Sequence, residues 1–217
     1  MVVTRSPVDG LAIWAGLIGA SVIALGSLVT ALAYTGSKGE PYSPLNHFVS
    51  ELGQLSVSRL ANVFNTSLIV GGVCFVVFMI GLTAAGEGWL RVGYGLVGVV
   101  AGVGGALVGV FPMDYLRVHS LAALTFFLLG LVTVALASID FVRRPDPRFP
   151  RWLSVVGAVT VAAFAIFLTI LFGGDDDLAH PDERVAIWPL TIFEWLLIVG
   201  ILFWVFLTAW SWRRATR

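Results

Sequence analysis

Histidines and carboxylates are the residues of this chain best suited to chemistry, and they gather in three short stretches. The sequence holds three histidines. His47 belongs to YSPLNHFVSELG, His119 follows FPMD, and His180 precedes ERVAIWPLTIFEW. Imidazoles and carboxylates bind catalytic zinc and act as general acids and bases in proteins. These stretches can act as one site only if the fold brings them together.

The first stretch has the pattern of a short amphipathic helix. Ser43 can cap a helix that Pro44 begins, and Gly53 can end it. His47 and Glu51 are four residues apart, so they are neighbours on one polar face of that helix. We expect the helix to lie at the membrane surface. Its polar face is then either solvated or turned toward the mouth of a helix bundle.

The other two stretches place ionisable groups at the ends of apolar segments. Asp114 and His119 flank the start of one segment, and Glu183 and Arg184 stand just before another. Glu194 lies about two turns inside the latter segment, where a charge costs about 3 kcal/mol on insertion scales. We therefore expect Glu194 to be protonated or paired with a polar residue of a neighbouring segment. The candidates for that partner are Asn62, Asn65 and Thr66.

Composition predicts that all these residues belong to a membrane protein. Of the 217 residues, 58% are hydrophobic and 12% are charged. An average soluble protein carries about twice that charged share, and a soluble fold of this size cannot bury so much apolar surface. The formal net charge is zero, and no run of Lys or Arg is long enough to bind nucleic acid.

Six apolar segments are long enough to cross the roughly 30 Å of bilayer hydrocarbon as helices. The predicted fold class is therefore all-α, a single integral membrane domain over residues 1–217 with six transmembrane helices. These helices are expected at about 11–34, 60–84, 92–111, 118–139, 153–173 and 185–209. The third contains two small-xxx-small pairs, Gly98/Gly102 and Gly105/Gly109, which predict close packing against a neighbouring helix.

The distribution of Lys and Arg predicts the orientation. Nine of these 13 residues lie at the termini and in the connections after the second and fourth helices, and four lie in the other connections. Positively charged residues concentrate on the cytoplasmic side. We therefore expect a multi-pass protein of the cell membrane with both termini in the cytoplasm. The connections that hold the three histidines are expected to be extracytoplasmic.

The same stretches resemble a known family. SELG at 50–53, FPMD at 111–114 followed by His119, and ERVAIWPLTIFEW at 183–195 look like the prokaryotic membrane family called domain of unknown function 998. That family is distantly similar to the superfamily of the damage-regulated autophagy modulator and a GPI-anchor lipid-remodelling protein. The resemblance implies a shared site. Its positions are Ser50, Glu51, Asp114, His119 and Arg184.

The first function compatible with these residues is an enzyme that modifies or hydrolyses lipids of the outer leaflet. His119 could act as a base, with Asp114 or Glu51 orienting it, and Arg184 could bind a phosphate or an oxyanion. A catalytic divalent metal such as zinc needs about three protein ligands and an open position. The candidate ligands are His47, Asp114 and His119.

Two other functions stay open beside the enzyme. One is a proton-coupled transporter of a small solute, with Glu194 on its path. The other is a non-catalytic protein that binds membrane lipids or a partner. Retinal is not expected, because the one lysine, Lys38, lies in a polar stretch. Haem is not expected either, because no histidine lies inside a predicted span.

Overall fold

Six long helices dominate the computed structural model, which describes residues 6–173 and 185–217. Each of the six is long and apolar enough to cross a membrane, which confirms the predicted all-α fold. The long helices are α1 (Pro7–Leu32), α2 (Ala61–Ala84), α3 (Trp89–Val110), α4 (Leu116–Arg143), α5 (Leu153–Gly173) and α6 (Pro189–Ala215). Two short 3₁₀ helices precede α2 and α4; they are η1 (Val49–Gly53) and η2 (Met113–Tyr115).

The helices extend past the apolar segments because local polar contacts, not hydropathy alone, set their ends. At the start of α1, the backbone N of Asp9 donates to Oγ of Ser6 at 3.1 Å, and the backbone N of Ser6 donates to Asp9 at 2.9 Å. This reciprocal capping box starts the helix four residues before its predicted beginning. At its C-terminal end, α4 continues past its predicted end at about residue 139, through the charged residue Asp140, to Arg143.

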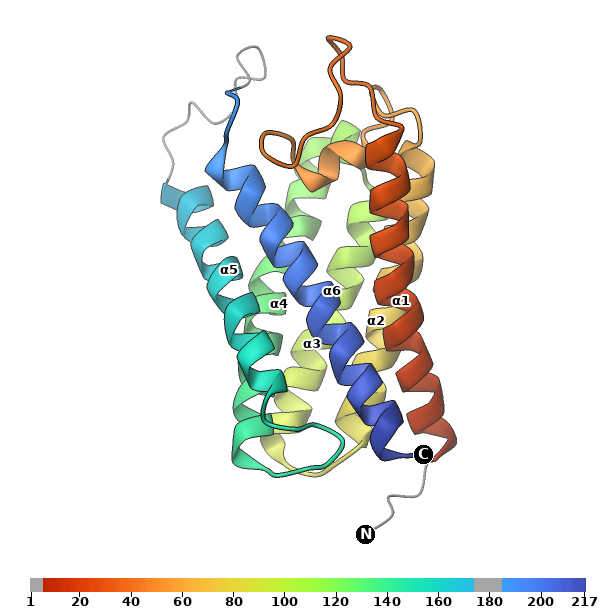
Figure 1. The fold of residues 1–217 in the computed structure, drawn as a ribbon, viewed down its shortest axis with the longest axis vertical. Coiled ribbons are helices and arrows are strands. Elements are labelled where there is room, and N and C mark those ends of the chain that lie inside the picture. Colours follow the sequence, from red (N-terminus) through yellow and green to blue (C-terminus); the bar gives the residue numbers. More distant parts are fainter. Residues whose placement is uncertain (1–5, 174–184) are drawn as a thin grey trace.

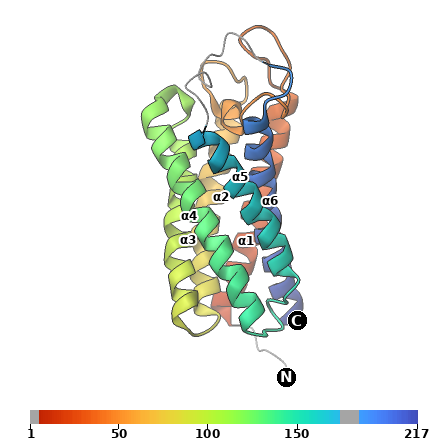
Figure 2. The same ribbon diagram turned by 90° about the vertical axis from the view of Figure 1, so that its left-hand side faces the viewer.

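The long helices form a ring in chain order. Each packs against its neighbours in sequence, and α6 returns to pack against α1. Figures 1 and 2 show that the start of α1 and the end of α6 lie at the same end as the connections α2–α3 and α4–α5. We call this the termini end. The opposite end carries the long connection between α1 and α2, and we call it the first-loop end.

Glycines let α2 and α3 approach closely. A Cβ added to Gly72 of α2 would lie 2.6 Å from the backbone N of Ala106, and one added to Gly109 of α3 would lie 2.4 Å from the carbonyl oxygen of Asn65. At Gly102 an added Cβ would lie 2.8 Å from the side chain of Val76. The small residues of α3 therefore serve helix packing, as their spacing predicted.

A buried ion pair joins α3 to α4 at the termini end. Asp140 is fully buried and Arg91 is 4% exposed. Nε and Nη2 of Arg91 donate to Oδ2 of Asp140 at 3.2 and 3.0 Å, and the hydroxyl of Tyr94 donates to the same oxygen at 3.3 Å. Nε of Arg144 lies 3.3 Å from Oδ1. Two guanidinium groups thus balance one buried carboxylate.

The connection between α4 and α5 covers this ion pair with an aromatic ring. Phe149 is fully buried, stacks on Phe141 with ring centroids 5.3 Å apart, and lies 5.4 Å from the guanidinium carbon of Arg91. Nearby, Nη2 of Arg148 lies 2.8 Å from Oδ2 of Asp146. Burial opposes ionisation of Asp146, but hydrogen bonds from Arg148 outweigh it and lower the pKa of that carboxyl.

Candidate functional site

The connection between α1 and α2 turns back into the ring at the first-loop end. Its first part is a tight reversal in which Thr35 pairs with Pro41 and Gly39 takes a positive φ of 81°. The short helix predicted in this connection is present as η1, which begins at Val49 rather than after Ser43. The chain before it forms a turn, because the backbone N of His47 donates to the carbonyl of Ser43 at 2.9 Å.

The polar side of η1 is buried instead of solvated. Glu51 is 6% exposed, and Leu52 is fully buried. Oε1 of Glu51 accepts a hydrogen bond from the backbone N of Phe48 at 2.8 Å, which caps the helix, and the hydroxyl of Tyr34 donates to Oε2 at 3.5 Å. Of the two predicted orientations, the one observed is the polar face turned toward the bundle. The backbone and side-chain groups of η1 find partners on the surrounding helices, so the helix can sink into the ring.

Side chains from α2 and α6 hold the two ends of η1. Oε2 of Glu194, which is 6% exposed, accepts the backbone N–H of Val49 at 2.7 Å. The side-chain nitrogen of Asn65 donates to the carbonyl of Gly53 at 2.9 Å. The polar partner expected for Glu194 on α2 is thus not used. Asn65 and Glu194 both bind η1, whereas Asn62 faces outward.

Asp114 holds the chain that follows η1. Its Oδ2 accepts the backbone N–H of Leu55 at 2.8 Å, and its Oδ1 accepts that of Ser56 at 3.1 Å. The hydroxyl of Ser50 donates to the sulfur of Met113 at 3.2 Å. The connection between α3 and α4 therefore fixes both η1 and the residues after it.

Tyr42 ties the same connection to α6. Its hydroxyl donates to the carbonyl of Phe48 at 2.9 Å and accepts the indole N–H of Trp195 at 2.9 Å. Burial raises the pKa of the Tyr42 phenol above its ordinary value, so the hydroxyl stays protonated and keeps donating. At the start of α6, the backbone N of Trp188 donates to the carbonyl of Leu45 at 2.7 Å.

His47 lies among aromatic rings, away from the other predicted metal ligands. Its ring centroid is 5.1 Å from that of Tyr42 and 5.5 Å from that of Tyr34, and Nε2 lies 3.9 Å from Oε1 of Glu40. Within residues 6–173 and 185–217, no three His, Cys, Asp or Glu side chains are placed to hold a metal ion. The predicted set of His47, Asp114 and His119 is therefore not assembled, because these side chains bind different parts of the loops.

His119 sits in the first turn of α4 with one ring nitrogen already bound. The residue is 6% exposed, and Nδ1 lies 2.9 Å from the carbonyl oxygen of Phe111. A carbonyl oxygen can only accept a hydrogen bond, so Nδ1 carries the hydrogen in the neutral ring. Nε2 is then the acceptor nitrogen, and His119 presents a base to whatever it faces.

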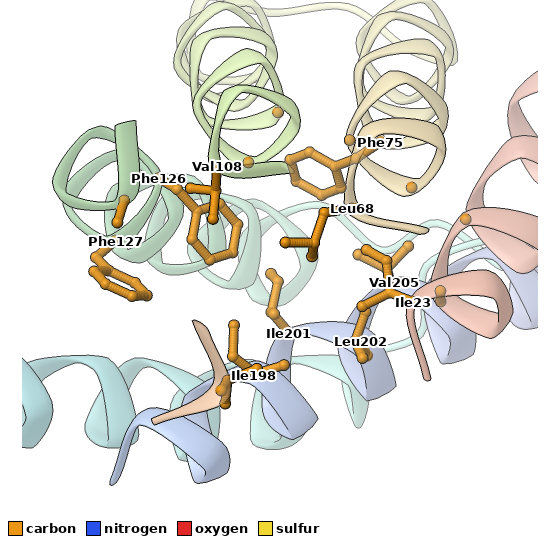
Figure 3. Close-up of a pocket in the computed structure, with 18 of the residues that line it drawn as sticks. Ile23, Leu68, Phe75, Val108, Phe126, Phe127, Ile198, Ile201, Leu202 and Val205 are labelled. Atoms are coloured by element: carbon orange, nitrogen blue, oxygen red, sulfur yellow. The ribbon is translucent and has the colours of Figure 1, made fainter. Parts of the chain in front are cut away.

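A cavity of about 100 Å³ lies inside the ring, directly below η1. Its walls come from α1, α2, α3, α4 and α6, and they are almost entirely apolar. Figure 3 shows Leu68, Phe126 and Ile201 pointing into the same space from three helices. Three of the lining residues carry polar side-chain groups. They are Ser50, His119 and Glu194.

The structure therefore brings together part of the predicted site. Ser50 and His119 line the cavity, whereas Glu51 and Asp114 act on the backbone of the first connection. Arg184 lies outside the described residues. Tyr34, Tyr42 and Trp195 were not predicted as part of the site, although aromatic residues beside a polar stretch were a visible signal in the sequence. Asp140, a charged residue only just beyond a predicted span, was not singled out either.

Comparison with known proteins gives one match. A family model described as "Protein of unknown function (DUF998)" matches residues 14–211. No curated protein and no solved structure matches the chain.

Proposed function

The chain belongs to the family described as proteins of unknown function DUF998, and from this premise we propose that it binds the hydrocarbon chain of a membrane lipid inside the helix ring. The family match covers most or all of each of the six spans. The distant similarity to lipid-remodelling proteins stays a prediction. The proposal rests instead on the cavity.

The observation that carries the proposal is an apolar cavity with polar groups at one end. Empty apolar cavities stay dry and bind apolar guests, and ligand pockets combine apolar walls with a few polar groups that orient the ligand. The cavity of about 100 Å³ has this composition, with Ser50, His119 and Glu194 near η1. A cavity of this size holds about one benzene-sized group. One segment of a lipid chain would therefore occupy the apolar part, and the polar part of the lipid would meet these three residues.

Small residues make room for such a chain. The cavity wall includes Gly71 and Gly72 of α2, Gly102 and Gly105 of α3, and Ala20 of α1. Without larger side chains at these positions, the helices can pack closely and still leave space along the ring axis. η1 then closes that space at the first-loop end. On the predicted orientation, this end is extracytoplasmic, so the ligand would be a lipid of the outer leaflet.

Binding is favoured over covalent catalysis by the contacts of Ser50. An activated serine needs a hydrogen bond to its base. In this arrangement the hydroxyl of Ser50 donates to the sulfur of Met113, and the ring of His119 is bound to the carbonyl of Phe111. Ser50 and His119, which both lie in the described part of the chain, do not bond to each other. We therefore favour lipid binding over lipid hydrolysis as the function.

A volume test distinguishes a lipid cavity from a packing gap. Ala20 lines the cavity, and Ala24, one turn further along α1, is exposed on the outside of the ring. We propose to purify the wild type, Ala20→Leu and Ala24→Leu in a mild detergent. Native mass spectrometry then measures the lipid that each protein retains. Ala123→Leu, on α4, fills the same cavity from the opposite wall.

We expect the wild type and Ala24→Leu to retain a bound lipid or another single-chain ligand, which native mass spectrometry shows as added mass. Both cavity-filling variants, Ala20→Leu and Ala123→Leu, should lose it while remaining monodisperse on gel filtration. A wild type without retained lipid would overturn the proposal. So would folded cavity-filling variants that keep the ligand.

A further inference from the structure

We infer that the polar group recognised in the cavity is an amine, so that the ligand is a long-chain amine or a lipid with an amino head group. This inference rests on the proposed function and names the class of its ligand. It starts from Glu194, whose side chain is 6% exposed and lines the cavity.

One oxygen of Glu194 is bound and the other is open to a ligand. Oε2 accepts the backbone N–H of Val49 at 2.7 Å. Oε1 forms no hydrogen bond with any residue that the structure describes. Oε1 keeps some accessible surface although the residue as a whole is nearly buried, and the space that Glu194 borders is the apolar cavity. Such a cavity offers the oxygen no donor of its own. A ligand in the cavity can supply that donor.

Charge balance points to a cationic donor. No Lys, Arg or His among residues 6–173 and 185–217 forms an ion pair with Glu194. Asp140, at the other end of the ring, is balanced by Arg91 and Arg144. A buried carboxylate without a counter-charge carries a large desolvation penalty. The ammonium group of a ligand would balance Glu194, and the pair is neutral whether the proton stays on nitrogen or moves to the carboxyl.

The neighbouring groups suit the same ligand. Nε2 of His119 is an acceptor, since Nδ1 donates to the carbonyl of Phe111. The oxygen of the Ser50 hydroxyl can also accept. A primary ammonium has three N–H donors, which matches the three polar residues of the cavity, Ser50, His119 and Glu194. A fatty acid would instead bring a second carboxylate against Glu194.

The test compares three probes that share one hydrocarbon chain and differ in the head group. Hexadecylamine, hexadecanol and hexadecanoic acid are titrated into the full-length protein in detergent, and native mass spectrometry measures each bound fraction. The proteins are the wild type, Glu194→Gln and Glu87→Gln. Glu87 is exposed at the termini end, so its variant loses the same charge without touching the cavity.

The Glu194→Gln variant is expected to fold like the wild type. The side-chain carbonyl of Gln can still accept the N–H of Val49, so η1 stays held. The wild type and Glu87→Gln should bind the amine about tenfold more tightly than the alcohol, as expected for a charged hydrogen bond. Glu194→Gln should lose about this factor for the amine and keep its affinity for the alcohol. Because each probe partitions into the detergent equally for all proteins, the comparison within one probe isolates Glu194.

The outcomes separate this inference from the proposed function. If the alcohol or the acid binds as well as the amine, or if Glu194→Gln leaves amine binding unchanged, the amine inference is wrong and lipid binding stands. If no probe binds to the wild type, lipid binding itself is overturned, and the inference with it. Preference for the amine that disappears only in Glu194→Gln supports both.

Discussion

Two buried carboxylates at opposite ends of the ring differ in the groups that bind them and balance their charge. Asp140, at the termini end, is enclosed by the guanidinium groups of Arg91 and Arg144 and by the hydroxyl of Tyr94. Glu194, at the first-loop end, binds one backbone N–H and turns toward the cavity. Both side chains are shielded from solvent, with exposed fractions of 0% and 6%.

The difference separates a carboxylate that is paired with cations of the protein from one that has no cationic partner among the described residues. The charge of Asp140 is balanced by Arg91 and Arg144, and Phe149 covers Arg91, although Oδ1 of Asp140 and Nη1 of Arg91 form no hydrogen bond with the described residues. Glu194 is held only through the neutral N–H of Val49. The negative charge is therefore needed for stability at Asp140 and is dispensable for stability at Glu194. Substitutions can test this contrast directly.

The largest effect is expected at the termini end. Asp140→Asn removes the carboxylate that is hydrogen-bonded to the buried guanidinium of Arg91, and breaking a buried ion pair costs about 3–5 kcal/mol. Thermal unfolding in detergent should show a strongly lowered midpoint. The double variant Arg91→Met/Asp140→Leu removes both charges and should recover most of the loss. An Asp140→Asn protein as stable as the wild type would show that the ion pair has no structural role.

A smaller effect is expected where a side chain of α2 holds η1. Asn65→Ala leaves the carbonyl of Gly53 buried without its donor, which costs about 1–2 kcal/mol. Asn62→Ala, on the exposed side of the same helix, is the matched control and should change stability little. Hydrogen exchange should quicken at Val49–Gly53 in Asn65→Ala alone. Equal exchange in both variants would contradict the role of Asn65.

The termini end should also depend on pH through Asp146. The pKa of Asp146 is lowered from its ordinary value of 3.8, chiefly by hydrogen bonds from Arg148 that outweigh burial. Its contribution to stability is therefore complete above that ordinary value and is lost as the pH falls through the lowered pKa. We expect a decline of about 1 kcal/mol for this half-buried pair. Asp146→Asn should remove this part of the acid dependence, measured as unfolding midpoints across the acidic range.

The smallest effect is expected from Glu194→Gln. Since Gln can still accept the N–H of Val49, unfolding in the absence of ligand should change by less than about 0.5 kcal/mol. The comparison with Asp140→Asn is the sharpest test of the contrast between the two ends. Similar losses of stability in both variants would contradict the contrast, because the charge of Glu194 would then also stabilise the fold.

The bundle could be predicted because hydropathy acts over whole segments. Helices α2 and α5 lie within a residue of their expected bounds, since their ends coincide with the ends of apolar runs. Helices α1, α4 and α6 run further at the termini end, because capping by Ser6 and charged residues such as Asp140 continue a helix that hydropathy alone would end.

The site was predicted in part, for a physical reason. Position in the sequence indicates which end of a span a polar residue occupies, so Ser50 and His119 were expected at one end of the ring, and both line the cavity. Periodicity within one segment says nothing about partners from other segments. Hence the sequence left two orientations open for the polar face of η1, and the contacts of Asn65 and Glu194 with its two ends decide between them.

The ring order of the helices has a consequence for biogenesis. Helices α2 to α6 can each pair with the preceding helix as the chain enters the membrane, because these contacts join neighbours in sequence. Local contacts of this kind form early and quickly. The contact of α6 with α1 is the exception, and α6 also carries Glu194, which fixes the start of η1. The cavity is therefore closed only when the sixth span is inserted, because a chain stalled before that point lacks α6 and the contact that fixes the start of η1.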